Sequence, residues 1–175
     1  MLQKPIDIEK SSRHQKIIGN LGEQLVCNWL SRSGFEVAVV DHTGIDLIAY
    51  DPRTRRRIGI TVKSRTRNPG KEKTSVNLIS NRKGEDDRKK VTSACETFNC
   101  EPWIAVYVET TEYADLFLTS LDNYDTNYRI SEKKVIDNWK MSPSWFKRYD
   151  EDPEVKHLHL KFEATSWFTA ETSTE

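Results

Sequence analysis

Apolar residues between positions 11 and 33 recur every three to four positions, the spacing that lines one face of an α-helix. They are followed by Gly34, a residue type that commonly follows a helix end because it adopts positive φ without strain. This pattern predicts an amphipathic helix over residues 11–33. The apolar face consists of Ile17, Leu21, Leu25, Val26, Trp29 and Leu30.

Short runs rich in β-branched residues replace this pattern from residue 35 onward. FEVAVV (35–40), IDLIAY (45–50) and RIGITVKS (57–64) each have the length and composition of a strand. The connections between them, DHTG and DPRTRR, are built from turn-forming residues. Three strands with such short connections predict an antiparallel meander or part of a mixed sheet.

A second helix and two further strands follow. EDDRKKVTSACETFN (85–99) has acidic residues in its first turn, where the helix dipole favours negative charge. PWIAVYVE (102–109) is strongly apolar and is expected to be a central strand, with EYADLFLTSL (112–121) as the next one. Between the third strand and this helix, VNLI (76–79) is a candidate short edge strand.

The last third of the chain has weaker signals. Residues 122–131 are expected to form a loop, and residues 132–149 a helix broken at Pro143. HLHLKFE (157–163) alternates polar and apolar residues and is expected to be an edge strand.

The predicted order of elements indicates a single α/β (α+β) domain with a mixed central sheet flanked by helices. Residues 1–10 would form an N-terminal arm. Residues 11–121 would form the core domain, and residues 122–175 an extension packed on that core.

The net charge is zero over 175 residues, but its distribution is uneven. Residues 51–90 carry 14 basic and 5 acidic side chains, whereas residues 91–175 carry 8 basic and 16 acidic ones. Such a basic segment suggests a surface that faces a polyanion. A solvated loop whose charges pair with the acidic half of the chain would give the same count, so both interpretations are open.

Targeting signals are not apparent in the sequence. The first 15 residues contain no apolar core of a signal peptide, and no apolar run approaches the ~20 residues that span a bilayer. The three cysteines, Cys27, Cys95 and Cys100, form no CxxC pair, which favours free, buried thiols in a reducing compartment. We therefore expect a cytoplasmic protein without a membrane partner.

An acid and a lysine stand inside otherwise apolar strands, at Asp46 and Lys63, and the first helix carries Glu23. In order and spacing these residues resemble the PD-(D/E)xK nuclease superfamily, which includes restriction endonucleases and the archaeal Holliday-junction resolvases, and the resolvase branch in particular. The resemblance lies in GNLGEQLVCNWLSRSGFEV (19–37), GIDLIAY (44–50) and ITVKSR (60–65). It implies a restriction-endonuclease-like fold.

The resemblance also implies the parts of a site. Asp46, Glu23 and the backbone carbonyl of Val62 would hold Mg²⁺, with Mn²⁺ as a substitute, because hard cations prefer oxygen ligands. Lys63 would orient the attacking water or stabilise charge on the phosphate. The implied partner is duplex or branched DNA, and a homodimer is the expected form of an enzyme that cuts both strands.

Thr61 departs from the family pattern, which has an acid or a glutamine two residues before the lysine. A hydroxyl is a weaker metal ligand than a carboxylate. Three explanations are open: Thr61 acts through a metal-bound water while Glu23 supplies the charge, the acid has migrated, or the fold has kept its shape and lost the chemistry. The candidates for a migrated acid are Glu85, Asp86 and Asp87.

Two further polar patterns flank these residues. Arg65, Arg67, Lys71 and Lys73 follow Lys63 closely and would suit contacts with DNA phosphates. His157 and His159, two residues apart, share a strand face, but no third metal ligand lies nearby in the sequence, so no zinc site is predicted.

The sequence thus predicts a metal-dependent DNA endonuclease or a nuclease-like DNA-processing protein that hydrolyses phosphodiester bonds. Because of Thr61 the enzyme assignment stays open. The alternative is a non-catalytic module that binds nucleic acid or assembles with partners and retains the nuclease scaffold.

Overall fold

The computed structural model describes residues 7–162 and contains four helices and eight strands in that range. Within it, no helix combines the length and the apolar character needed to cross a membrane. The elements in chain order are α1 His14–Arg32, β1 Glu36–His42, β2 Ile45–Asp51, β3 Arg56–Thr66, β4 Val76–Ser80, α2 Asp87–Thr97, β5 Glu101–Glu109, β6 Tyr113–Ser120, α3 Leu121–Asn127, β7 Ile136–Trp139, α4 Pro143–Glu151 and β8 Lys156–Lys161.

Six strands form one mixed sheet in the order β1-β2-β3-β5-β6-β8. The meander β1-β2-β3 is antiparallel, β5 joins β3 in parallel, and β6 and β8 continue antiparallel. The expectation of a mixed central sheet flanked by helices is confirmed, and the apolar strand at residues 102–109 is central. The candidate strand at residues 76–79 is also confirmed, as β4, but it pairs with β7 in a separate two-stranded sheet.

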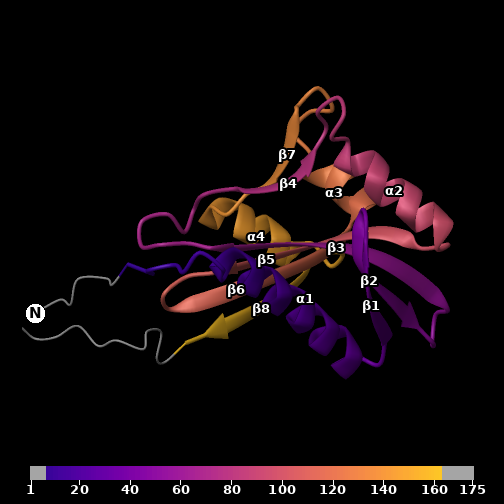
Figure 1. Ribbon diagram of the computed structural model, residues 1–175, viewed down its shortest axis with the longest axis horizontal. Coiled ribbons are helices and arrows are strands. Elements are labelled where there is room, and N and C mark those ends of the chain that lie inside the picture. The colour runs from indigo at the N-terminus through magenta and orange to yellow at the C-terminus, as the bar shows by residue number, and fades with distance from the viewer. Residues whose placement is uncertain (1–6, 163–175) are drawn as a thin grey trace, which may run out of the picture.

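The helices are divided unequally between the two faces of the sheet. Figure 1 shows α1 on one side, with α2, α3, α4 and the β4–β7 pair on the other. Two apolar cores result: one between α1 and the sheet, around Val26, Ile60 and Leu116, and one under α2 and α4, around Ile104 and Phe117. The side chains of each strand alternate between these two cores.

A glycine brings α1 close to β3. A Cβ atom at Gly22 would lie 2.1 Å from Oγ of Ser64, so a larger side chain would push the helix away from the strand. The next residue along α1 is Glu23. The close approach therefore places this acid beside the meander that carries Asp46.

The region after β6 differs from the sequence prediction. Residues 122–131 are not simply a loop, because α3 spans Leu121–Asn127, and Oγ of Ser120 accepts the N–H of Asn123 to cap it. Its Asp and Asn residues are poor helix formers, which hid the helix from pattern analysis. The helix predicted over 132–149 was also wrong in its first half: β7 occupies Ile136–Trp139, and Pro143 is the first residue of α4 instead of a break.

The aromatic residues near the C-terminal end form a packed cluster. Trp139 stacks on Tyr149 with ring centroids 4.1 Å apart, and Phe117 of β6 contacts both residues. Residue 163, the last of the predicted strand 157–163, lies outside the described residues. The three cysteines are free, and burial raises the pKa of Cys95 to about 11 and also raises the pKa of Cys27 and Cys100, which disfavours the reactive thiolate form.

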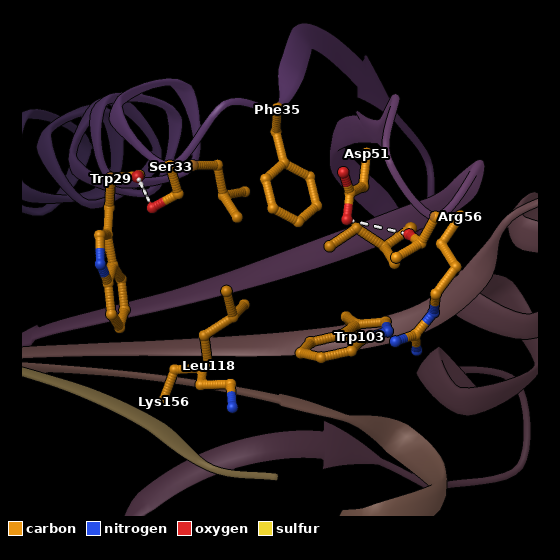
Figure 2. A pocket seen from close by; sticks show the side chains of 11 residues that line it. Trp29, Ser33, Phe35, Asp51, Arg56, Trp103, Leu118 and Lys156 are labelled. Atoms are coloured by element: carbon orange, nitrogen blue, oxygen red, sulfur yellow. Dashed lines mark hydrogen bonds between the residues drawn. The ribbon is translucent and has the colours of Figure 1, made fainter. Parts of the chain in front are cut away.

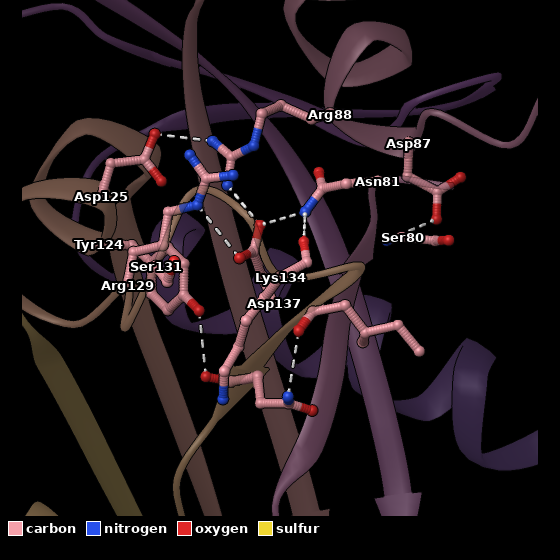
Figure 3. Close-up of polar contacts among 12 residues, drawn as sticks. Ser80, Asn81, Asp87, Arg88, Tyr124, Asp125, Arg129, Ser131, Lys134 and Asp137 are labelled. Atoms are coloured by element: carbon pink, nitrogen blue, oxygen red, sulfur yellow. Dashed lines mark hydrogen bonds and ion pairs between the residues drawn. The ribbon is translucent and has the colours of Figure 1, made fainter. Parts of the chain in front are cut away.

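A buried carboxylate joins α2 to the segment between α3 and β7. Asp137 is 2% exposed and accepts hydrogen bonds from Arg88 at 2.7 Å, Arg129 at 3.1 Å and Asn81 at 2.9 Å. Figure 3 shows these three side chains converging on Asp137, while Arg88 also reaches Asp125. Burial alone would raise the pKa of Asp137, but these hydrogen bonds outweigh burial and lower it. The network fixes α2 on the sheet.

We expect Asp137→Ala to lower the free energy of unfolding by about 3–5 kcal/mol, because it leaves two guanidinium groups without their buried partner. Urea denaturation at pH 7 measures this loss. The matched control is Glu132→Ala, an exposed acid nearby, which should change stability by no more than about 0.5 kcal/mol. Equal losses in the two variants would show that Asp137 is not the anchor of α2.

Candidate active site

Strands β2 and β3 part at the position of Asp46. Their ladder runs from Asp51↔Arg56 to Leu47↔Ile60, and β3 then continues along β5. At the opening, Oδ2 of Asp46 accepts the backbone N–H of Val62 at 2.6 Å. The carboxylate thus takes the place of a backbone partner and holds the two strands apart at a fixed distance.

A cavity of about 210 Å³ lies at this opening and collects four charged side chains. Asp46 enters it from β2, and Lys63 enters from β3, on the same strand face as the hydroxyl of Thr61. Helix α2 contributes Asp87 and Lys90. The structure therefore brings Asp46, Thr61 and Lys63 together, as the sequence analysis expected of one site.

Gly44 allows α2 to close over the cavity. Its φ is +110°, and a Cβ atom there would lie 2.4 Å from the carbonyl oxygen of Lys90. The β1–β2 turn and the helix backbone are therefore in direct contact. The cavity wall depends on this contact, because Gly44, Lys90 and the neighbouring Val91 all line it.

One of the three candidate migrated acids lines the cavity. Asp87 accepts the backbone N–H of Ser80 at 3.2 Å and pairs with Lys90 at 3.1 Å. Asp86 instead caps α2 by accepting the N–H of Lys89, and Glu85 is exposed and is not among the lining residues. Of these three acids, Asp87 is therefore the one that could supply the negative charge that Thr61 lacks.

Burial dominates the electrostatics of Asp46. It raises the pKa of the carboxyl, although the N–H of Val62, the charge of Lys63 and the hydroxyl of Thr61 each lower it. Nearby Asp41 raises it further. The ionised form of Asp46 thus lowers the stability of the folded protein, and a cation bound in the cavity would offset this effect.

Glu23 lies within the electrostatic influence of Asp46. It does not line the cavity, but burial and then the charges of Asp46 and Asp41 raise the pKa of Glu23. Sequence reasoning missed Asp41, which lies near the end of β1 with φ of +43°, where the pairing with β2 is irregular. The sequence pattern had assigned this residue to the turn DHTG between the two strands.

The donor set fits a hard divalent cation. Asp46 and Asp87 offer carboxylate oxygens to the same cavity, and Mg²⁺ is commonly held by one or two carboxylates together with waters and substrate phosphates. Val62, the third predicted ligand, directs its N–H to Asp46. The two lysines balance the two carboxylates, so the cavity carries no net charge before a substrate enters.

The predicted DNA-contacting residues lie at the end of β3 and in the loop that follows it. Arg65 continues the strand face of Lys63 and donates to the carbonyl of Ser64 at 2.7 Å. Arg67 donates to the carbonyls of Thr74 and Ser75, which closes the loop. Burial and the adjacent charge of Arg65 lower the pKa of Arg67, so an anion between the two guanidinium groups would be stabilised. Lys71 and Lys73 are exposed.

A second cavity, of about 280 Å³, lies on the α1 face. Figure 2 shows its aromatic walls, which include Trp29, Phe35 and Trp103. Its polar groups are paired with their own neighbours: Asp51 with Arg53 and Thr54, and Arg56 with Glu101. Because no titratable side chains converge without partners there, the cavity at Asp46 is the better candidate for chemistry.

Sequence comparison provides no family for this chain: no family model and no curated protein matches it. Among solved structures, it is similar to Hjc, a Holliday junction resolvase from the archaeal hyperthermophile Archaeoglobus fulgidus. The two share 14% sequence identity at a TM-score of 0.49, over 70% of this chain and 83% of that chain. At this level of similarity, the function of the chain is inferred from the side chains that line the cavity at Asp46.

We expect Asp46→Asn to raise the free energy of unfolding at pH 7 by about 1 kcal/mol. Because the pKa of Asp46 is higher in the folded protein than the 3.8 of the unfolded chain, the free energy of unfolding falls as pH rises above 3.8. At pH 7 the carboxyl is ionised in both states, so its full destabilising effect is present. The amide oxygen of Asn can still accept the N–H of Val62. Urea denaturation as a function of pH should show the difference shrinking toward pH 3.8.

The matched control is Asp51→Asn, at the other end of β2. Burial raises the pKa of Asp51, but hydrogen bonds from Arg53 and Thr54 lower it overall, so this substitution should have the opposite sign and destabilise the protein at pH 7. If Asp46→Asn were less stable than the parent at pH 7, the conclusion that ionised Asp46 destabilises the folded protein would be wrong.

Proposed function

We propose that the protein is a metal-dependent DNA endonuclease, or a closely related DNA-processing phosphodiesterase, of the PD-(D/E)xK type. The observation that carries this proposal is the meeting of Asp46, Thr61 and Lys63 in one cavity, where β2 and β3 part. A half-buried carboxylate and an ammonium group that line the same cavity of about 210 Å³ suit phosphodiester hydrolysis.

Each residue has a defined part in this proposal. Asp46 would bind the cation, with Asp87 as the second carboxylate in the position that Thr61 leaves without charge. Bound Mg²⁺ would supply charge neutralisation and a more acidic water. Lys63 would orient that water or stabilise the phosphate oxygens. Glu23 would add a negative charge beside the metal, because it lies close enough to Asp46 for the charge of Asp46 to raise its pKa.

The basic segment after β3 would hold the DNA. Arg65 lies on the same strand face as Lys63, and Arg67, Lys71 and Lys73 follow in the loop that Arg67 closes. Contacts of this kind position a duplex or branched DNA without reading its sequence. Cleavage of both strands would require two such sites, for which a homodimer is the simplest arrangement. Free thiols are in keeping with a cytoplasmic protein.

One observation favours a second candidate function. Lys90 pairs with Asp87 at 3.1 Å, so the cavity is already neutral, and Thr61 adds no charge. Such a site would hold a divalent cation weakly. The alternative is therefore a non-catalytic nucleic-acid-binding or assembly module that keeps the nuclease scaffold.

The test is cleavage of labelled linear duplex, four-way branched and single-stranded DNA, with Mg²⁺, Mn²⁺ or EDTA. We expect metal-dependent cleavage by the parent and a loss of about 10²-fold or more in Asp46→Asn. Because that variant should fold at least as well as the parent, the loss would be chemical. Asp87→Asn should cause a similar loss, and Thr61→Glu should restore part of the activity of Asp87→Asn.

The control is Asp86→Asn, which changes the neighbouring acid outside the cavity and should leave cleavage within a few-fold of the parent. Binding of DNA without cleavage of any substrate, in either metal, would favour the non-catalytic module. If Asp87→Asn cleaves as fast as the parent while Asp46→Asn does not, Asp87 is not the migrated acid.

The binding surface has its own test. We expect the affinity for DNA to fall steeply with salt, and the double variant Lys71→Ala/Lys73→Ala to reduce the slope of log K against log salt concentration by about 2. The control is Arg53→Ala, a basic residue that pairs with Asp51 at the opposite end of the meander. An affinity independent of salt, measured by fluorescence anisotropy, would contradict both nucleic-acid interpretations.

A further inference from the structure

A second cluster of metal-ligating side chains lies at the other end of the sheet. Asp115 of β6 and His159 of β8 are direct partners in the antiparallel ladder, and His157 lies opposite Phe117 two residues before. Oδ1 of Asp115 is 2.8 Å from Nε2 of His157 and 2.7 Å from Nδ1 of His159. One ligand atom from each of the three residues lies within 4.8 Å of the others.

The carboxylate at the centre is deeply buried. Asp115 is 1% exposed, and its two imidazole contacts go to the same oxygen. A buried carboxylate requires compensation, by hydrogen bonds or by a cation. Two imidazole nitrogens already lie within 2.8 Å of this oxygen, so small movements would place all three ligand atoms around one cation.

A second carboxylate fixes the orientation of His157. Its Nδ1 lies 2.8 Å from Oδ1 of Asp150 on α4, and its ring stacks on Phe117 with centroids 4.2 Å apart. In protein metal sites a ligating histidine commonly donates its other N–H to a carboxylate, which sets the tautomer. A neutral His157 has one N–H, which would go to Asp150 and leave the Nε2 lone pair for a metal.

Charge and exposure are consistent with a divalent ion. In a metal-bound form the two imidazoles would be neutral, so a divalent cation would balance the two negative charges of Asp115 and Asp150. The side chain of His159 is 43% exposed on an edge strand, so it can withdraw by the roughly half ångström that metal bonds of about 2.0–2.1 Å require. Its exposure also leaves a coordination position open to water.

We propose that Asp115, His157 and His159 form a binding site for a first-row divalent transition metal ion, of which Zn²⁺ is the probe. Two imidazoles and one carboxylate suit Zn²⁺ or Fe²⁺ and disfavour Mg²⁺, which prefers an all-oxygen shell. The bound ion fastens the edge strand β8 to β6 and, through Asp150, to α4. This site is independent of the cavity at Asp46.

The experiment is equilibrium dialysis of the metal-stripped full-length protein against Zn²⁺, with a large excess of Mg²⁺ present. We expect one Zn²⁺ per chain, and an affinity at least about tenfold lower in His159→Gln and in Asp150→Asn. The matched control is His42→Gln, an exposed histidine of β1 outside the cluster, which should bind as the parent does. Circular dichroism verifies that each variant is folded.

A second readout identifies the ligands. Co²⁺ in place of Zn²⁺ should give visible bands of a nitrogen and oxygen shell without thiolate charge transfer, and hydrogen exchange of β8 should slow when metal is added. Absence of saturable Zn²⁺ binding by the parent, unchanged binding by His159→Gln, or a thiolate spectrum would overturn the proposal. None of these measurements requires DNA cleavage. As a further control, the variant Asp46→Asn should bind Zn²⁺ as the parent does.

Discussion

The hydrogen bond between the Asp46 carboxylate and the N–H of Val62 is the interaction on which the candidate site depends. An open gap between two strands would leave a backbone donor without a partner, which is costly away from water. The carboxylate satisfies this donor and at the same time places a negative charge in the gap. Beyond it, β3 is free to pair with β5 alone, and its side chains at Thr61 and Lys63 face the cavity. One residue thus marks the opening of the sheet and places a carboxylate in the cavity.

The cavity wall is held by contacts remote from it. Helix α2 brings Asp87 and Lys90 to the site, and the same helix carries Arg88 into the buried network around Asp137. Successive residues of α2 point to different sides, so the anchor and the two cavity residues occupy different faces of a single helical turn. The position of Asp87 relative to Asp46 is consequently set by a network whose residues do not line the cavity.

Local patterns predicted the meander, both long helices and the central strand, because strong periodicity and glycine turns mark them in the sequence. They failed where tertiary pairing decides: β7, with the sequence IDNW, is a strand because β4 pairs with it, and α3 depends on its Ser120 cap. The site was predictable as far as Asp46, Thr61 and Lys63, which share two adjacent strands. Choosing Asp87 among three consecutive acids required the direction of α2, and finding Asp115 required the β6–β8 register. The spacing of residues within one segment of the sequence does not indicate which distant segment it will contact.

Two clusters of opposite character lie on the same face of the sheet, the face covered by α2 and α4. At Asp46 the ligands are oxygens and two lysines balance them, so a cation there would be weakly held and exchangeable, as suits a metal that engages a substrate phosphate. At Asp115 the ligands include two imidazoles, and no lysine or arginine is among the partners of the described cluster, so a metal there would be held by the protein itself. The oxygen ligands at Asp46 and the imidazole ligands at Asp115 prefer different metal ions. Each site could therefore be emptied or filled without the other. In this proposal the sheet would bind an exchangeable metal through oxygen ligands at its meander and a firmly held metal through nitrogen ligands at its opposite edge.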